Sequence, residues 1–452
     1  MFSAPKPNLT LPMQTYFYQL ADFIGTRIRA DETYLANLSA EDSSFVRFNQ
    51  NLVRQAGSVK QIGLTLSLIA KQHRAESHLT LSGQQDNDQA LVTATLESLR
   101  RDLEDLPEDP YLLFNQTPQS TERVGESQIA PAADILDQVI SQGQGKDLVG
   151  IYAAGAIYKG FANSLGQRNW HRVDNFNFEW CLYHTADKAV KSSYAGTHWD
   201  SAEFARKMAS SSEQFAILKR SPKQLVPGQY RAYLTPSAMN EILGLLSWEA
   251  FGVKAQRNKQ SPLLKLEDGS ASLNRAVHVS ENSQDGVAPG FQADGFIKSA
   301  EVRLIDGGKH AGALVSPRSA REFSIDTNGA NSAEAPESLD MGAGHMHRDD
   351  ALKTLGTGIL IGNLHYLNFS DRRACRMTGM TRFATFWVEQ GEIKAPLNVM
   401  RFDDSAYRVL GENLLALTVE RELILDSGTY GERSTGSARL PGGLVKDFAL
   451  TL

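Results

Sequence analysis

The chain has 452 residues, of which 41% are hydrophobic and 22% are charged, and its formal net charge is −6. This length exceeds the needs of one small core, so we expect two domains in an ordinary globular protein. The acidic balance argues against nucleic acid as a direct partner, because a phosphate backbone requires a concentrated basic face. No stretch approaches the roughly 18 uninterrupted apolar residues of a membrane span, so we expect no membrane association.

The N-terminus and the cysteines favour a cytoplasmic location. Residues 1–7 lack the basic start and apolar core of a secretion signal. Cys181 and Cys375 are the only cysteines in the sequence. Two cysteines cannot build a disulfide framework, so we expect both to be reduced thiols.

The N-terminal half is predicted to be an antiparallel sheet with flanking helices. Apolar residues at helical spacing predict helices at 11–29, 86–106, 131–142 and 201–211. Runs with strand propensity lie at 45–48, 52–54, 62–69, 148–153, 157–162, 173–184 and 188–195. We expect an α+β domain over residues 1–222, in which residues 107–131, rich in Pro, Gln, Ser and Thr, form an exposed connector. The domain linker is placed at residues 219–228.

The C-terminal half is predicted to be a β-rich domain, residues 229–452, wrapped around one buried helix. The helix is expected over residues 236–252, with Thr235 as its cap and Pro236 at its first position. Nearly every face of this helix is apolar, which predicts burial. Residues 326–349, rich in Gly, Ala, Asn and Ser, are expected to form a long surface loop. The overall fold class is therefore α+β.

Residues 358–402 are predicted to contain the functional site. Strand-forming segments flank Arg376-Met-Thr-Gly-Met-Thr-Arg382, which places arginines and hydroxyls where a hairpin is usually apolar. Alternation puts Asn363 and His365 on one face of a strand. The candidates for binding an extended peptide along the sheet edge are Asn363, His365, Arg376, Thr378 and Arg382. Alternatively, the arginines pair with Asp371, Asp403 and Asp404 to fix turns, and His365 is a structural residue.

Several blocks in this stretch resemble the C-terminal core of the TldD/PmbA family. They are Asn363-Leu-His-Tyr-Leu-Asn368, Arg376-Met-Thr-Gly379, Phe386-Trp-Val-Glu-Gln-Gly391 and Pro396-Leu-Asn-Val-Met-Arg-Phe402. With further blocks in the middle of the chain, the resemblance covers roughly residues 145–452, and a looser match runs over residues 45–69. Members of this family were named as modulators of DNA gyrase and are treated as predicted metallopeptidases. The resemblance implies a cytosolic, dimeric protein connected with the maturation and turnover of peptides.

The TldD branch of the family carries a His-Glu-x-x-x-His motif on the buried helix, where two histidines hold zinc and the glutamate polarises its water. The corresponding positions here are Trp248, Glu249 and Val253. Neither Trp248 nor Val253 can bind zinc, so the resemblance implies a PmbA/TldE-like chain without metal, and zinc is expected only in a TldD-type partner subunit. Glu249 is either a retained catalytic base or a structural anchor paired with an arginine such as Arg376 or Arg382.

Two other functions remain open from the sequence. One is an active metallopeptidase whose metal is held elsewhere, for example by His345, His347 or His365. The other is a homodimeric peptide-binding protein without catalysis. Binding to DNA or gyrase is disfavoured by the net charge.

Overall fold

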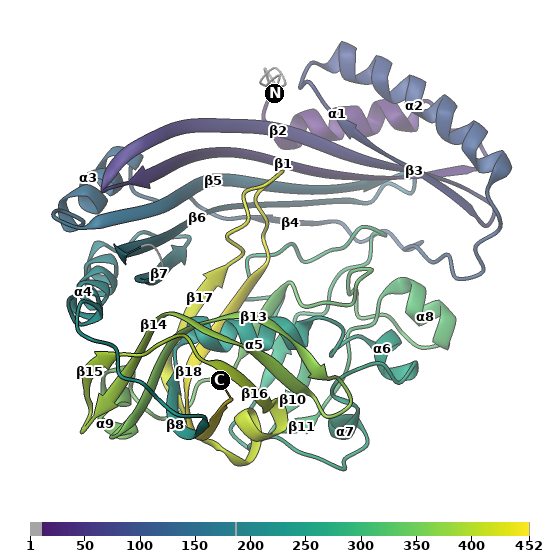
Figure 1. Ribbon diagram of the computed structural model, residues 1–452. Helices are drawn as coiled ribbons and strands as arrows, with labels where there is room; N and C mark the ends of the chain where they lie inside the picture. The colour runs from purple at the N-terminus through teal and green to yellow at the C-terminus, as the bar shows by residue number, and fades with distance from the viewer. Residues whose placement is uncertain (1–10, 186–187, 452) are drawn as a thin grey trace.

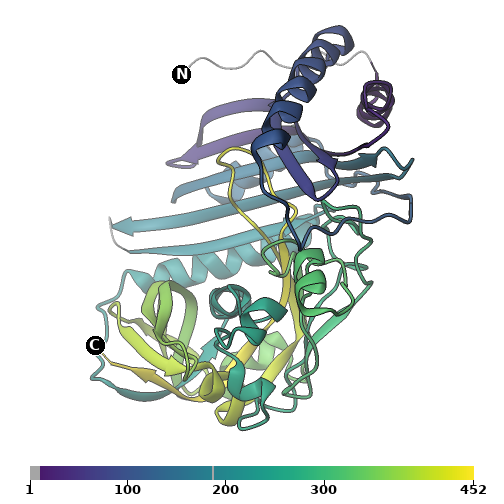
Figure 2. The same cartoon turned by 90° about the vertical axis from the view of Figure 1, so that its right-hand side faces the viewer.

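The computed structural model describes residues 11–185 and 188–451 and contains two sheets, one above the other in Figure 1. The upper sheet comes from the N-terminal half and the lower one from the C-terminal half, with the two stacked again in the perpendicular view (Figure 2). This arrangement confirms the predicted α+β class. None of the helices in the described ranges has the length and apolar character that a bilayer crossing needs.

The N-terminal sheet has the strand order β3-β2-β1-β5-β6-β4, and β7 pairs with β6 further along the same edge as β4. Its pairings are antiparallel except for the short β4 against β6. The strands are β1 (Glu32–Asn49), β2 (Leu52–Ala70), β3 (His73–Thr80), β4 (Thr121–Val124), β5 (Asp147–Asn163), β6 (Arg168–Thr185) and β7 (Lys188–Gly196). The helices are α1 (Met13–Gly25), α2 (Gln85–Asp105), α3 (Ala132–Gln142) and α4 (Ser201–Leu218).

These strands are longer than the sequence predicted. β1 begins at Glu32 rather than near Phe45. The prediction missed its first half because small and polar residues such as Ser39 and Asp42 obscure the alternation of apolar and polar side chains. β5 continues through Gly155, which has a φ of 143° and lies against the backbone of Asp42, where a side chain would collide. The predicted connector at 107–131 contains β4.

Helices cover the two ends of the N-terminal sheet differently. α1 and α2 lie together over one end, where Leu20 and Leu96 pack against sheet residues such as Leu66. At the other end α4 lies between the two halves of the molecule. Its buried Phe204 belongs to a cluster that includes Trp180 of β6 and Phe386 of the C-terminal sheet. The hydrophobic core is therefore continuous between the halves at α4.

The C-terminal sheet has the strand order β11-β10-β9-β12-β18-β16-β14-β13-β8, with β15 on β14 and β17 on β18. Its strands are β8 (Gly228–Leu234), β9 (Val279–Glu281), β10 (Val302–Asp306), β11 (Lys309–His310), β12 (Ser338–Met341), β13 (Gly358–Asp371), β14 (Arg376–Glu389), β15 (Glu392–Pro396), β16 (Arg401–Ser405), β17 (Leu414–Leu425) and β18 (Ser437–Leu450). The helices are α5 (Pro236–Ser247), α6 (Val253–Arg257), α7 (Leu264–Glu267), α8 (Pro317–Phe323), α9 (Ala351–Leu355), η1 (Arg348–Asp350) and η2 (Arg408–Glu412).

The buried helix, α5, is shorter than predicted. Its apolar side chains, among them Ile242 and Leu246, are fully buried in the largest core cluster. Thr235 caps it as expected, since its hydroxyl accepts the N–H of Ala238 at 3.3 Å. The helix ends at Ser247 instead of residue 252, because Glu249 adopts a left-handed backbone with a φ of 71°.

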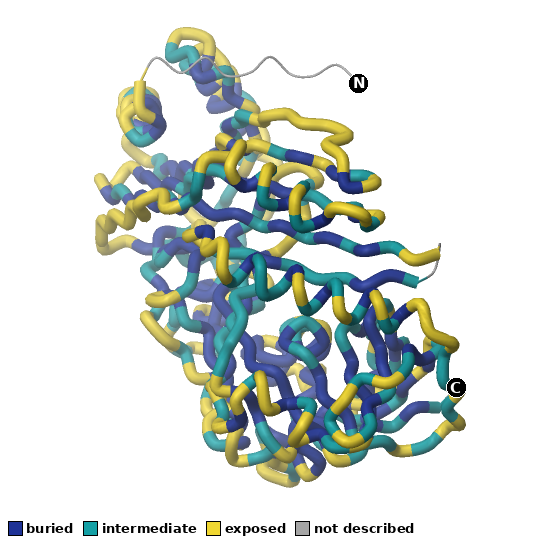
Figure 3. Tube along the Cα trace, turned by 90° about the vertical axis from the view of Figure 1, so that its left-hand side faces the viewer, coloured by how far each residue is buried: buried dark blue, intermediate teal, exposed yellow. Residues whose placement is uncertain are grey.

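The prediction of a surface loop at residues 326–349 is also wrong, because many residues of this segment are buried in the C-terminal half. It contains β12, and Glu334 is only 3% exposed. The Glu334 carboxylate accepts hydrogen bonds from the backbone N–H groups of Lys254 and Ser316, at 2.8 and 3.0 Å. Buried segments run through the centre of the lower half of the molecule, while exposed segments follow its rim (Figure 3).

A hairpin formed by β17 and β18, here called the hairpin clasp, connects the C-terminal half to the N-terminal sheet. Its tip reaches across the N-terminal sheet toward β1 (Figures 1 and 2). Arg433 at this tip is 5% exposed and donates to the hydroxyl of Ser43 and the main-chain oxygen of Asn175, at 3.2 and 3.0 Å. The carboxylate of the nearby Glu41, which is 2% exposed, favours the charged form of this buried guanidinium. Its negative charge opposes the lowering of the Arg433 pKa by desolvation.

Candidate functional site

A cleft separates the N-terminal sheet from α5 and the C-terminal sheet. It holds two adjoining cavities of about 510 and 220 Å³. Lys191, Ser192 and Ser193 of β7 and Ser237 of α5 line both cavities. The two cavities are therefore parts of one cleft, whose larger part falls in the size range of ligand sites.

One wall of the cleft is a polar stripe on α5. Ser237, Asn240 and Glu241 line the smaller cavity, and the exposed Gly244 continues the stripe toward the end of the helix. These positions are three or four residues apart and so lie on one face. The apolar remainder of α5 dominated the sequence pattern, and the spacing of these four residues is the signal that could have revealed the stripe.

The opposite wall carries Lys191, whose ammonium pairs with the carboxylate of Glu179 at 2.8 Å. Glu241 faces these two charges from α5. Desolvation within the cleft raises the pKa of Glu241, the positive charge of Lys191 opposes that rise and the negative charge of Glu179 adds to it. The cleft thus contains a carboxyl group that takes up a proton more readily than a free glutamate.

Three of the five candidate residues lie near this cleft. Asn363 of β13 lines the smaller cavity and is directly opposite Arg382 of β14 in the strand pairing. Its Oδ1 atom is buried and has no hydrogen-bond partner among the described residues. His365 is on the same strand face, and its pKa is lowered by desolvation and then by the positive charges of Arg382 and Lys191. His365 is therefore biased toward the neutral, uncharged imidazole.

The other two candidates are engaged elsewhere. Arg376 forms an ion pair with Asp403 of β16, which is the turn-fixing alternative. The hydroxyl of Thr378 donates to the main-chain oxygen of Phe402 at 3.0 Å and accepts from Nε of Arg401 at 3.1 Å. Arg382 differs from Arg376 because its guanidinium lies 5.2 Å from the centre of the Phe383 ring, with no carboxylate partner among the described residues.

The C-terminal end of α5 holds the positions of the expected zinc motif. Trp248 is 69% exposed, and Val253 is buried at the start of α6. Glu249 forms an ion pair with Arg372, rather than with Arg376 or Arg382 as anticipated. Arg372 also donates from Nε to the main-chain oxygen of Gln260 at 2.8 Å. Glu249 therefore joins the end of α5 to two neighbouring segments.

Other residues that could bind metal are dispersed. His345 and His347 are exposed on either side of the buried Met346, and His347 contacts Glu420 at 3.2 Å. In the described ranges, no three His, Cys, Asp or Glu side chains come together in a way that could hold an ion. Burial raises the pKa of Cys181 to about 11 and that of Cys375 to about 12, so both are protonated thiols at neutral pH.

Comparison with known proteins identifies the family of this chain. Residues 227–451, which carry α5 and the whole C-terminal sheet, match the family model for the PmbA/TldA metallopeptidase C-terminal domain. The chain belongs to the TldD/PmbA family. No curated protein sequence matches it.

The structural similarity to solved proteins extends over nearly the whole chain. A protein from Thermotoga maritima described as a candidate modulator of a DNA gyrase has a TM-score of 0.75 and 12% identity, and covers 97% of this chain and 100% of its own. TldE from Thermococcus kodakarensis has a TM-score of 0.74 and 12% identity, with the same coverage. A candidate modulator of DNA gyrase from Bacteroides thetaiotaomicron has a TM-score of 0.70 and 13% identity, covering 97% and 98%.

The metallopeptidase description raises the question of whether these residues fit a zinc ion. They do not at the end of α5, because an indole and an isopropyl group replace the imidazoles and α5 stops before Val253. The carboxylate that would act on zinc-bound water is paired with Arg372. No step of a zinc-dependent reaction can be assigned to this end of the helix.

Proposed function

We propose that this TldD/PmbA-family chain is a peptide-binding, metal-free subunit of a cytoplasmic proteolytic assembly. A TldD-like partner that retains both histidines supplies the zinc and the hydrolytic step. The present chain supplies the cleft that holds an extended peptide.

The observation that carries this proposal is the contrast between the cleft and the end of α5. Asn363 lines the cleft beside the polar stripe, and its carboxamide oxygen lacks a partner among the described residues. His365 lies two residues further along β13, and Arg382 lies opposite Asn363 on β14. Peptide backbones offer hydrogen-bond donors and acceptors at the spacing of a strand, which suits such a surface. The zinc-motif positions, in contrast, carry an exposed tryptophan and a buried valine.

Measurements of metal content and peptidase activity test whether the partner, and not this chain, supplies the zinc and the hydrolytic step. We expect the purified chain to hold no stoichiometric zinc and to leave peptides uncut. Mixing it with a relative from the same genome that carries His-Glu-x-x-x-His should produce a stable complex and chelator-sensitive cleavage. Near-stoichiometric zinc in the isolated chain, together with cleavage that a chelator abolishes, would overturn the proposal.

A matched pair of arginine variants tests the cleft. Arg382→Met should weaken the binding of a labelled peptide by several-fold, because it removes a guanidinium that has no carboxylate partner among the described residues. Arg376→Met removes the same group from the same strand face but leaves peptide affinity unchanged, since Arg376 is paired with Asp403. Equal effects of the two changes would contradict the placement of the peptide near Arg382.

A further inference from the structure

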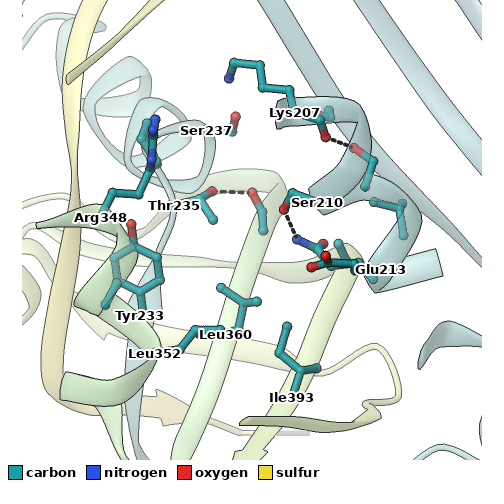
Figure 4. A pocket seen from close by; sticks show the side chains of 18 of the residues that line it. Lys207, Ser210, Glu213, Tyr233, Thr235, Ser237, Arg348, Leu352, Leu360 and Ile393 are labelled. Carbon is teal, nitrogen blue, oxygen red and sulfur yellow. Dashed lines mark hydrogen bonds between the residues drawn. The ribbon is translucent and has the colours of Figure 1, made fainter. Parts of the chain in front are cut away.

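The larger cavity has an apolar end and a polar end. Ile217 of α4, Leu352 of α9, Leu360 of β13 and Ile393 of β15 line the apolar end. In Figure 4 the side chains of Leu352, Leu360 and Ile393 lie together on one side, while Lys207, Ser237 and Arg348 lie on the other. A ligand that fills this cavity therefore has an apolar group and a polar or charged group a short distance apart.

The polar end has hydrogen-bond donors without acceptors. Tyr233 is only 6% exposed, yet its hydroxyl lines the cavity and has no hydrogen-bond partner among the described residues. The hydroxyl of Ser237 is likewise unpartnered within those residues. The first turn of α5 adds another donor, because Pro236 has no N–H and Thr235 accepts the N–H of Ala238, which leaves the N–H of Ser237 without an acceptor in the described part of the chain.

Arg348 supplies the charge at this end. Its Nε atom is buried without a hydrogen-bond partner among the described residues and lies 4.0 Å from a carboxylate oxygen of the exposed Asp349. Its Nη1 atom is 3.9 Å from carboxylate oxygens of both Glu203 and Glu422. Those carboxylates make their close contacts with other cations: Glu203 with Arg206 at 2.7 Å, and Glu422 with Lys207 at 2.6 Å. The guanidinium of Arg348 thus keeps hydrogen-bonding capacity for an additional acceptor.

The tyrosine ring depends on a glycine in β18. A Cβ atom at Gly442 would lie 2.3 Å from the Tyr233 hydroxyl oxygen, so only glycine leaves room for the ring at this position. Tyr233 also remains un-ionised, because burial and the neighbouring Glu422 raise its pKa. Its O–H is therefore a donor to an incoming acceptor under ordinary conditions.

We propose that this cavity binds the C-terminal residue of a peptide, with its α-carboxylate held by Arg348, Tyr233 and the Ser237 end of α5 and its apolar side chain among Leu352, Leu360 and Ile393. A carboxylate matches this set because it is an acceptor with two oxygens and suits both a guanidinium fork and a helix N-terminus. This assignment rests on the proposed peptide-binding function and adds the direction in which the peptide lies. The remainder of the peptide leaves past Ser237 and Lys191, which the two cavities share.

The test compares N-terminally labelled hexapeptides ending in leucine, as the free acid and as the C-terminal amide, by fluorescence anisotropy at one fixed ionic strength. The free acid should bind at least about tenfold more tightly, since the amide loses the charge-assisted hydrogen bonds. Arg348→Met should bring the free acid down to the affinity of the amide. Tyr233→Phe, which preserves the ring, should remove part of the difference.

Arg318→Met is the matched control. Arg318 of α8 pairs with Asp109 at 2.6 Å and does not line the cavity, so this variant should keep the full preference for the free acid. Unchanged binding of the amide to Arg348→Met shows that the variant is folded. N-acetyl-leucine should compete with the free-acid peptide, and N-acetyl-leucinamide should not.

The outcomes separate this assignment from the function on which it rests. Equal affinity for acid and amide would overturn the carboxylate assignment while leaving the peptide-binding proposal intact. A preference for the acid that survives Arg348→Met would also overturn it. If neither peptide binds, both proposals are wrong.

Discussion

The two ends of α5 differ although one apolar face runs between them. At the N-terminal end, Thr235 caps the helix, and Ser237 opens into a cavity with unpartnered donors. At the C-terminal end, Glu249 turns the chain and pairs with Arg372, while Trp248 is exposed. This contrast teaches that one buried helix can pack along its whole apolar face while its two ends carry different groups.

The apolar face common to both ends gives the largest expected effect. Leu246→Ala should lower the free energy of unfolding by about 2–5 kcal/mol, because Leu246 is fully buried and its removal leaves a cavity. Urea denaturation measures this change. A loss below about 1 kcal/mol would mean that α5 is not central to the core, and the comparison of its ends would lose its basis.

The N-terminal end should be the more sensitive of the two. Thr235→Ala removes the cap and also the hydrogen bond from its hydroxyl to the main-chain oxygen of Gly362 at 2.7 Å. We expect a loss of about 1–2 kcal/mol in the same denaturation experiment. Thr235→Ser keeps the hydroxyl and serves as the control, with most of the stability retained.

The C-terminal end should tolerate loss of its ion pair. Arg372 and Glu249 have side chains that are 41% and 51% exposed, so their attraction is screened by water. Arg372→Met should cost less than about 1 kcal/mol, and added salt should reduce the difference further. A cost as large as that of Thr235→Ala would show that the two ends contribute equally.

The polar stripe between the ends should respond to pH. Folding raises the pKa of Glu241, so the folded state binds more protons than the unfolded state and its stability falls as the pH rises from the unfolded pKa through the folded one. Glu241→Gln should therefore stabilise the protein at pH 7 by a few tenths of a kcal/mol, discounted for solvent screening. Thermal melts at pH 7 and pH 4 measure this, and the difference should vanish at pH 4.

The sequence predicted those features that depend on local pattern. The cap at Thr235, the apolar face of α5 and the segment containing β13 and β14 were all found, because each has a period or a turn residue that marks it. The end of α5 was misplaced, since the left-handed conformation of Glu249 has no signal in residue type. Likewise, the buried Glu334 acts through distant backbone groups, which a loop-like composition conceals.

No local pattern in the sequence indicated the larger cavity. Its polar end is assembled from Tyr233 of β8, Ser237 of α5 and Arg348 of η1, with Lys207 contributed by α4. Each of these residues is ordinary in its own segment, and only the tertiary fold brings them together. The Asn363 and Arg382 pair was within reach because both belong to adjacent strands of one hairpin.

The hairpin clasp has a consequence for the order in which the protein acquires its structure during translation. Arg433 is synthesised 258 residues after Asn175, to which it binds. Domains usually fold as they emerge from the ribosome, the earliest-made one first. Here the earliest-made sheet contains the buried acid Glu41, and its counter-charge arrives only when the hairpin emerges. The nascent N-terminal half must therefore wait for the end of the C-terminal half before it is complete.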